Sequence, residues 1–139
     1  GMNVMDVGTG SGILSIAAAK LGAAHVLALD IDQDAIKATR ANVKINGLQR
    51  VVKLQRRTIS PEDNIENEFD LVVANLYTKV ILSIAPTLVA GLAPKGNLVL
   101  SGILAERVGE VERSLAMEGC TLLRMDREGD WAVLVGVKN

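Results

Sequence analysis

The chain has 139 residues, 49% of them hydrophobic, which suits one globular domain with a sizeable core. A net charge of −1 and 2% aromatic residues give neither the positive field nor the stacking surface of a protein that binds nucleic acid directly. No apolar run is long enough to span a membrane, and a lone cysteine, Cys120, fits a reducing compartment, so we expect a cytoplasmic protein without a membrane partner.

Apolar strands and amphipathic helices alternate along the first third of the chain. Gly22 and the pair Asn46-Gly47 supply helix ends. The hydrophobic spacing predicts strands over 3–7, 25–29 and 51–55, and helices over 11–21 and 34–45. Residues 60–63 open at most a short helical turn.

The alternation continues and then stops near the C-terminus. We expect strands over 69–76 and 97–100 and helices over 80–92 and 106–117; the run 69–76 reads as a strand buried on both faces. Two more strands, 121–126 and 131–137, are joined by the short segment 127–130. Because this connection is too short for a crossover helix, the two strands must pair antiparallel.

The motif DVGTGSG directly follows the first expected strand. Its glycines, Gly8, Gly10 and Gly12, allow a tight strand-to-helix turn that another molecule can approach closely. Asp30, at the tip of the second strand, is a carboxylate that can accept both hydroxyls of a ribose. Together they predict a ligand that contains adenosine. NAD and S-adenosylmethionine both fit, but the glycine spacing is not the dinucleotide form and the C-terminal hairpin is foreign to the NAD fold.

The segments DVGTGSGILSIAAAKLGA, ANVKING, FDLVVANL, LSGIL and EGDWAVLV carry a resemblance over nearly the whole chain. They resemble class I methyltransferases and, more narrowly, the catalytic domain of the ribosomal protein methyltransferases that modify lysine and terminal amines on a large-subunit stalk-base protein. The resemblance implies an α/β fold: a Rossmann-like, doubly wound, seven-stranded sheet, mostly parallel, with an antiparallel C-terminal hairpin.

The resemblance also implies site residues. Gly8, Thr9, Gly10 and Gly12 would line the methionine and ribose parts of S-adenosylmethionine. Asp6 would orient the loop or hold the methionine amino group, and Asp30 and Ile31 would contact ribose and adenine. Asn75 would lie beside both the sulfonium and the incoming amine, as a cofactor-binding and catalytic residue.

The sequence departs from the family pattern near the expected adenine and acceptor. Many methyltransferases place an acid after the third strand, where this chain has Arg56-Arg57-Thr58; we expect Thr58 to contact adenine and the arginines to be solvated charges. Tyr77 either stacks near the acceptor amine or is a helix-start residue packed on the end of the sheet. His25 is expected to be structural and Trp131 to pack in the hairpin, and neither a metal site nor a cysteine nucleophile is predicted.

The resembled family has a separate amino-terminal domain that grips the substrate, whereas this chain begins almost on its first strand. We therefore expect residues 1–139 to be a single S-adenosylmethionine-binding domain that lacks an upstream substrate-binding domain, rather than a short relative with another substrate. The expected function is methyl transfer to protein amines of a ribosomal protein. The alternatives are a small-molecule or nucleic-acid acceptor, or a cofactor-binding domain without activity of its own.

Overall fold

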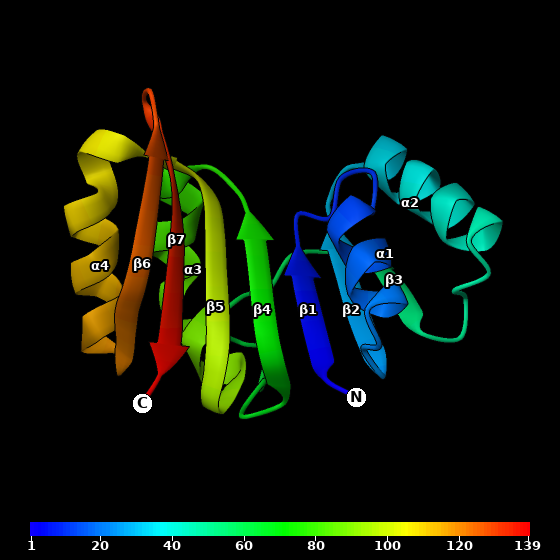
Figure 1. Cartoon of the computed structure of the whole chain (residues 1–139), viewed down its shortest axis with the longest axis horizontal. Helices are drawn as coiled ribbons and strands as arrows, with labels where there is room; N and C mark the ends of the chain where they lie inside the picture. The colour runs from blue at the N-terminus through cyan, green and yellow to red at the C-terminus, as the bar shows by residue number, and fades with distance from the viewer. The chain divides into compact units, whose positions relative to one another are not determined.

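The computed structural model describes all 139 residues, which form two compact units, Gly1–Thr58 and Ile59–Asn139 (Figure 1). Each unit has its own strands and helices, and each is described below by itself. None of the helices is both long and apolar enough to cross a membrane.

The first unit is a parallel sheet with two helices packed against it. In chain order its elements are β1 (Asn3–Val7), α1 (Ile13–Lys20), β2 (His25–Asp30), α2 (Gln33–Ile45) and β3 (Val52–Arg56). The strands are parallel in the order β3-β2-β1, and Val7 pairs with Leu29. Because the carboxyl ends of parallel strands share one edge, the glycine loop after β1 meets the tip of β2 there.

The first residue of each helix in this unit is set by the residues just before it. The helix expected from residue 11 begins at Ile13, because Gly10 and Gly12 have φ of +60° and +84°, a left-handed backbone that a right-handed helix cannot include. In α2, the Asp32 carboxylate caps the first turn by accepting a 3.0 Å hydrogen bond from the Asp34 amide.

The second unit contains the reversed strand that the sequence predicts. Its elements are β4 (Phe69–Asn75), α3 (Thr78–Gly91), β5 (Leu92–Leu104), the 3₁₀ turn η1 (Ala105–Arg107), α4 (Val108–Met117), β6 (Cys120–Glu128) and β7 (Trp131–Lys138). The strand order is β4-β5-β7-β6, with β4 and β5 parallel and β7 antiparallel to both of its neighbours. Figure 1 shows β5, β7 and β6 side by side, with β7 in the middle.

Several boundaries in this unit differ from those expected. Strand β5 covers 13 residues instead of four, because the strand continues through two shifts in pairing register. Its pairing with β4 shifts register between Phe69 and Leu71, and its pairing with β7 shifts around Gly102, which has φ of +78°. Helix α3 begins at Thr78, two residues earlier than expected, and the hairpin turn is only residues 129–130.

Strand β4 is not equally buried on its two faces, contrary to the expectation. Val72 and Ala74 are fully buried, whereas Leu71 and Val73 are half-buried. Helices α3 and α4 pack against each other and against strands of this unit. Residues 60–63 form a turn and not a helix, as the sequence allowed.

Candidate functional site

The glycine loop leaves β1 in a left-handed conformation at three alternate residues. Gly8, Gly10 and Gly12 have φ of +80°, +60° and +84°. The loop is tied to the end of β2, because the amides of Gly8 and Thr9 both donate to the Leu29 carbonyl, at 2.8 and 2.9 Å. This arrangement requires glycine at these positions, since other L residues adopt such angles only at a cost.

Asp30 joins the tip of β2 to this loop. Its Oδ2 accepts a 2.9 Å hydrogen bond from the Gly10 amide, and its Oδ1 accepts one of 2.9 Å from the Asp32 amide. The residue is only half-buried. Each carboxylate oxygen can accept more than one hydrogen bond, so both keep capacity for a further donor.

Asp6 lies beneath the loop and is almost completely buried, with 1% of its surface exposed. Its Oδ2 accepts hydrogen bonds from Ser15 Oγ at 2.8 Å and from Thr9 Oγ1 at 2.9 Å, while its Oδ1 has no hydrogen-bond partner. Burial raises the pKa of Asp6 above its ordinary value, and the two hydroxyl donors oppose that shift. These contacts join β1, the loop and the start of α1.

Helix α2 contacts the same loop through two side chains. Thr39 Oγ1 donates to the Gly10 carbonyl at 2.8 Å, and Asn42 Nδ2 donates to the Ser11 carbonyl at 2.8 Å. Sequence reasoning missed these residues and Ser15. Helical spacing places Thr39 on the buried face of α2 with Ile36 and Val43, and a polar residue on that face was the one signal available.

Two further expected residues lie at the edge of this network without joining it. The Ile31 side chain is 67% exposed, and Thr58 is exposed two residues beyond β3. Arg56 is exposed, in agreement with the expected solvated charge, and its Nε donates to the Ile31 carbonyl at 3.1 Å. Arg57 differs from that expectation, because it is half-buried and its Nε donates to Gln55 Oε1 at 2.7 Å.

Asn75 and Tyr77 belong to the second unit. Asn75 ends β4 opposite Ser101, and its Oδ1 would lie 3.0 Å from a Cβ built on Gly102. Tyr77 precedes α3 with 80% of its surface exposed, so the interpretation that it packs on the end of the sheet is wrong. Its role towards an acceptor stays a prediction.

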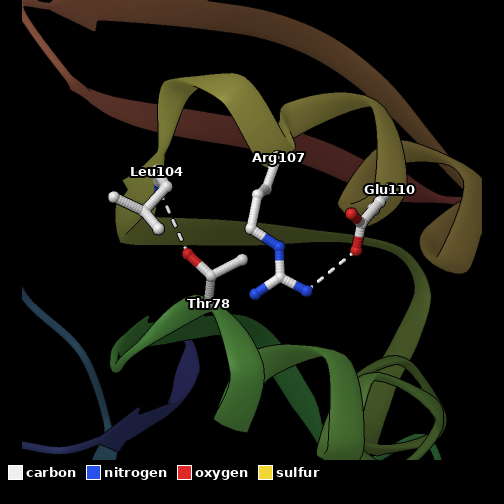
Figure 2. A network of polar contacts seen from close by, with 4 residues as sticks. All are labelled: Thr78, Leu104, Arg107 and Glu110. Carbon is white, nitrogen blue, oxygen red and sulfur yellow. Dashed lines mark hydrogen bonds and ion pairs between the residues drawn. The ribbon is translucent and has the colours of Figure 1, made fainter.

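The connections that follow β4 and β5 are joined next to these residues. The Leu104 amide donates to Thr78 Oγ1 at 2.9 Å, and Arg107 pairs with Glu110 at 2.9 Å (Figure 2). Thr78 is buried, with 3% exposed. A hollow of about 320 Å³ borders this region, lined by Leu104, Ala105, Glu106, Arg127 and Asp130.

The remaining candidates for chemistry are isolated. No group of three or more His, Cys, Asp or Glu side chains is placed to hold a metal ion. Cys120 is buried, and burial raises the pKa of its thiol, which disfavours the thiolate. His25 is exposed at the start of β2, and Trp131, expected to pack in the hairpin, has 53% of its surface exposed because it lies beside the turn.

The glycine loop, the acid at the next strand tip and the reversed strand β7 are features of the class I methyltransferase fold. Two solved methyltransferase structures are similar to this chain over nearly its whole length. The ribosomal protein L11 methylase of Lactobacillus delbrueckii subsp. bulgaricus is 36% identical, with a TM-score of 0.88 over 99% of this chain and 71% of that one. A magnesium protoporphyrin IX methyltransferase from Synechocystis, at 20% identity and a TM-score of 0.79 over 100% of this chain and 71% of that one, shares the fold. The expected fold class, α/β and Rossmann-like with seven mostly parallel strands and an antiparallel C-terminal hairpin, is confirmed.

The family follows from the whole sequence. The family model of ribosomal protein L11 methyltransferase (PrmA) matches residues 1–139, so the chain belongs to this family and the resemblance is confirmed. The ribosomal protein L11 methyltransferase of Geotalea daltonii is 42% identical over 133 residues, which are 96% of this chain and 41% of that protein. The chain spans about two fifths of the length of the curated relatives that it matches.

Proposed function

We propose that the first unit binds S-adenosylmethionine at the glycine loop and Asp30. The observation that carries this proposal is the joining of the loop to the strand-tip carboxylate through the Gly10 amide. A Cβ built on Gly10 would meet no atom within 4 Å, so the main chain there is open to a ligand. The Asp30 oxygens keep lone pairs for the ribose hydroxyls, and exposed Ile31 offers an apolar surface for adenine. Thr58 would be a further adenine contact.

The chemistry that this cofactor supplies when bound is a methyl group on a positively charged sulfur, which a neutral amine can attack in line. The protein residues bind and align the reactants. Asn75, at the end of β4, would orient the acceptor by accepting a hydrogen bond from the amine through its side-chain oxygen. An amide does not titrate near pH 7, so solvent would take the amine proton.

The acceptor that we propose is an amine of a ribosomal protein, either lysine or the amino terminus. Support comes from membership of the L11 methyltransferase family and from the names of the relatives. Exposed Tyr77, which precedes α3, would contact the acceptor. A cytoplasmic location and the absence of direct nucleic-acid binding accompany this proposal.

Two measurements on the 139-residue chain test the function. Calorimetric titration with S-adenosylmethionine should show saturable binding by this chain. Transfer of label from methyl-labelled cofactor should be weak with this chain alone, and the label should reach ribosomal protein L11 and not free lysine or RNA. Binding by this chain without transfer to any acceptor, while the full-length Geotalea daltonii protein labels L11, would favour a cofactor-binding domain without activity of its own. Label on a small amine or RNA, with none on L11, would favour the other acceptors.

A comparison of this chain with a full-length relative tests which part of the protein places the substrate. Correct alignment of reactants can contribute about 7–11 kcal/mol to lowering a barrier. We propose that part of this alignment comes from the regions of the relatives beyond the matched two fifths. The Geotalea daltonii protein should then methylate L11 faster than this chain at equal cofactor saturation. Equal rates would show that residues 1–139 place the substrate by themselves.

A further inference from the structure

Helix α2 binds the Gly10 carbonyl, whereas Asp30 binds the Gly10 amide. Thr39 Oγ1 donates to the Gly10 carbonyl at 2.8 Å, while the Gly10 amide donates to Asp30 Oδ2 at 2.9 Å. Both hydrogen-bonding groups of Gly10 are therefore occupied by side chains that come from different elements. Asn42, one turn further along α2, holds the neighbouring Ser11 carbonyl at 2.8 Å.

Thr39 uses both of its side-chain groups against the loop. Its hydroxyl binds Gly10, and its Cγ2 would lie 2.7 Å from a Cβ built on Gly12. The residue is completely buried, with 0% exposed. Because the methyl group packs against Gly12 and the hydroxyl holds Gly10, this one side chain sets the distance between α2 and the loop.

The Thr39 hydrogen bond also determines where the next amide points. A peptide group is planar and trans, so its carbonyl and its N–H point in opposite directions. With the Gly10 carbonyl directed at α2, the Ser11 N–H of the same peptide is directed away from α2. Backbone N–H groups held in this way in left-handed loops are donors for anionic ligand groups.

We propose that Thr39 is a positioning residue that presents the Ser11 amide to the carboxylate of the bound cofactor, with Asn42 in a supporting role. The inference rests on the proposed binding of S-adenosylmethionine. In this proposal, helix α2 supports the cofactor-binding loop, although neither Thr39 nor Asn42 has to contact the ligand.

Three substitutions separate the hydroxyl from the packing. Thr39→Val keeps the volume and removes the hydrogen bond, Thr39→Ser keeps the hydroxyl, and Asn42→Ala removes an exposed contact and leaves the core unchanged. Thr87→Val, at another buried threonine on α3, is the matched control.

The first readout needs no ligand. In the cofactor-free chain the Gly10 amide is bonded to Asp30 and the Gly12 amide to the Thr9 carbonyl, so both report opening of the loop. Their hydrogen exchange should become at least about threefold faster in Thr39→Val, because the lost hydrogen bond contributes on the order of 0.5–1.5 kcal/mol to keeping the loop closed. Thr39→Ser and Thr87→Val should leave exchange in the loop unchanged. Unchanged exchange in Thr39→Val would overturn the proposal, as would equal acceleration in the Thr87→Val control.

The second readout is calorimetric affinity for S-adenosylmethionine. Thr39→Val should raise the Kd roughly threefold to tenfold, Asn42→Ala should raise it by less, and Thr39→Ser should restore most of the affinity. Faster exchange together with an unchanged Kd would overturn the positioning role.

If the wild-type chain bound no cofactor, the proposed function and this positioning role would both be wrong, while the exchange data would still decide whether Thr39 holds the loop. If Thr39→Val did not fold, an unchanged Kd in Asn42→Ala together with weak binding by Thr39→Ser would contradict the proposal.

Discussion

The Asp30 carboxylate accepts a hydrogen bond of 2.9 Å from the Gly10 amide, which connects the tip of β2 to the middle of the glycine loop. Asp30 therefore shapes the loop in addition to offering lone pairs to a ligand. A residue with both tasks should be sensitive to substitution.

Asp30→Ala should weaken S-adenosylmethionine binding about tenfold to a hundredfold. The substitution removes charge-assisted hydrogen bonds worth roughly 1.5–3 kcal/mol and also frees the Gly10 amide. Calorimetry on both chains measures the effect, with Asp34→Ala, an exposed acid in the first turn of α2, as the control. An unchanged Kd in Asp30→Ala would remove Asp30 from the site.

Asp6→Asn should change how stability depends on pH. The pKa of Asp6 is raised by burial, so the native chain keeps this proton to a higher pH than the unfolded chain. As pH rises from the ordinary pKa of 3.8 to the raised value, the wild-type chain loses unfolding free energy, at most about 1.4 kcal/mol per pH unit.

The asparagine has no such titration and keeps an acceptor for Ser15 and Thr9. Urea unfolding of both proteins between pH 4 and pH 8 should therefore show a difference in unfolding free energy that shifts in favour of Asp6→Asn as pH rises. This interval covers the range in which the pKa values of buried carboxyl groups usually fall. A difference that stays constant with pH would contradict the raised pKa.

Asn75→Ala should lower turnover while leaving cofactor affinity nearly intact. The side chain ends β4 and lies over Gly102, where its oxygen is available to an acceptor amine in the proposed reaction. Loss of alignment should reduce kcat roughly tenfold to a hundredfold at saturating cofactor. The opposite pattern, weak cofactor binding with normal turnover at saturation, would assign Asn75 to the binding site alone.

Gly102→Ala should destabilise the chain more than Gly129→Ala. Both glycines have positive φ, +78° and +59°, and each alanine costs about 1–2 kcal/mol for that backbone. Only at Gly102 would the new Cβ also crowd its neighbours, Asn75 Oδ1 at 3.0 Å and the Leu76 carbonyl oxygen at 3.3 Å, whereas nothing lies within 4 Å at Gly129. Urea unfolding compares the two variants. Equal losses would mean that both the Asn75 side chain and the Leu76 carbonyl make room for the new Cβ at no cost.

Thr78→Val should lower the unfolding free energy by about 1–3 kcal/mol. Thr78 is buried and its hydroxyl is the acceptor for the Leu104 amide, which valine would leave without a partner (Figure 2). Thr78→Ser should recover most of the loss. A Thr78→Val chain as stable as the wild type would show that the Leu104 amide finds water instead.

The sequence by itself determined the features that depend on neighbouring residues. Apolar runs specified the strands, Gly8, Gly10 and Gly12 specified a left-handed loop because other residues adopt that backbone at a cost, and the short segment before Trp131 required an antiparallel pair. Asp30 could be placed beside the loop because parallel strands end at one edge.

Tertiary structure alone decided which polar side chains hold that loop. Thr39 lies 29 residues from Gly10, and its helical spacing is equally suited to a place in the core and to a hydrogen bond with the loop. Ser15 likewise reads as one more residue of an apolar helix until the packing of α1 brings its hydroxyl to Asp6. The exposure of Tyr77 and the length of β5 also could not be predicted from the pattern of neighbouring residues. The physical reason is that periodicity reports which face of an element is buried, whereas the partner across that face depends on how the elements pack.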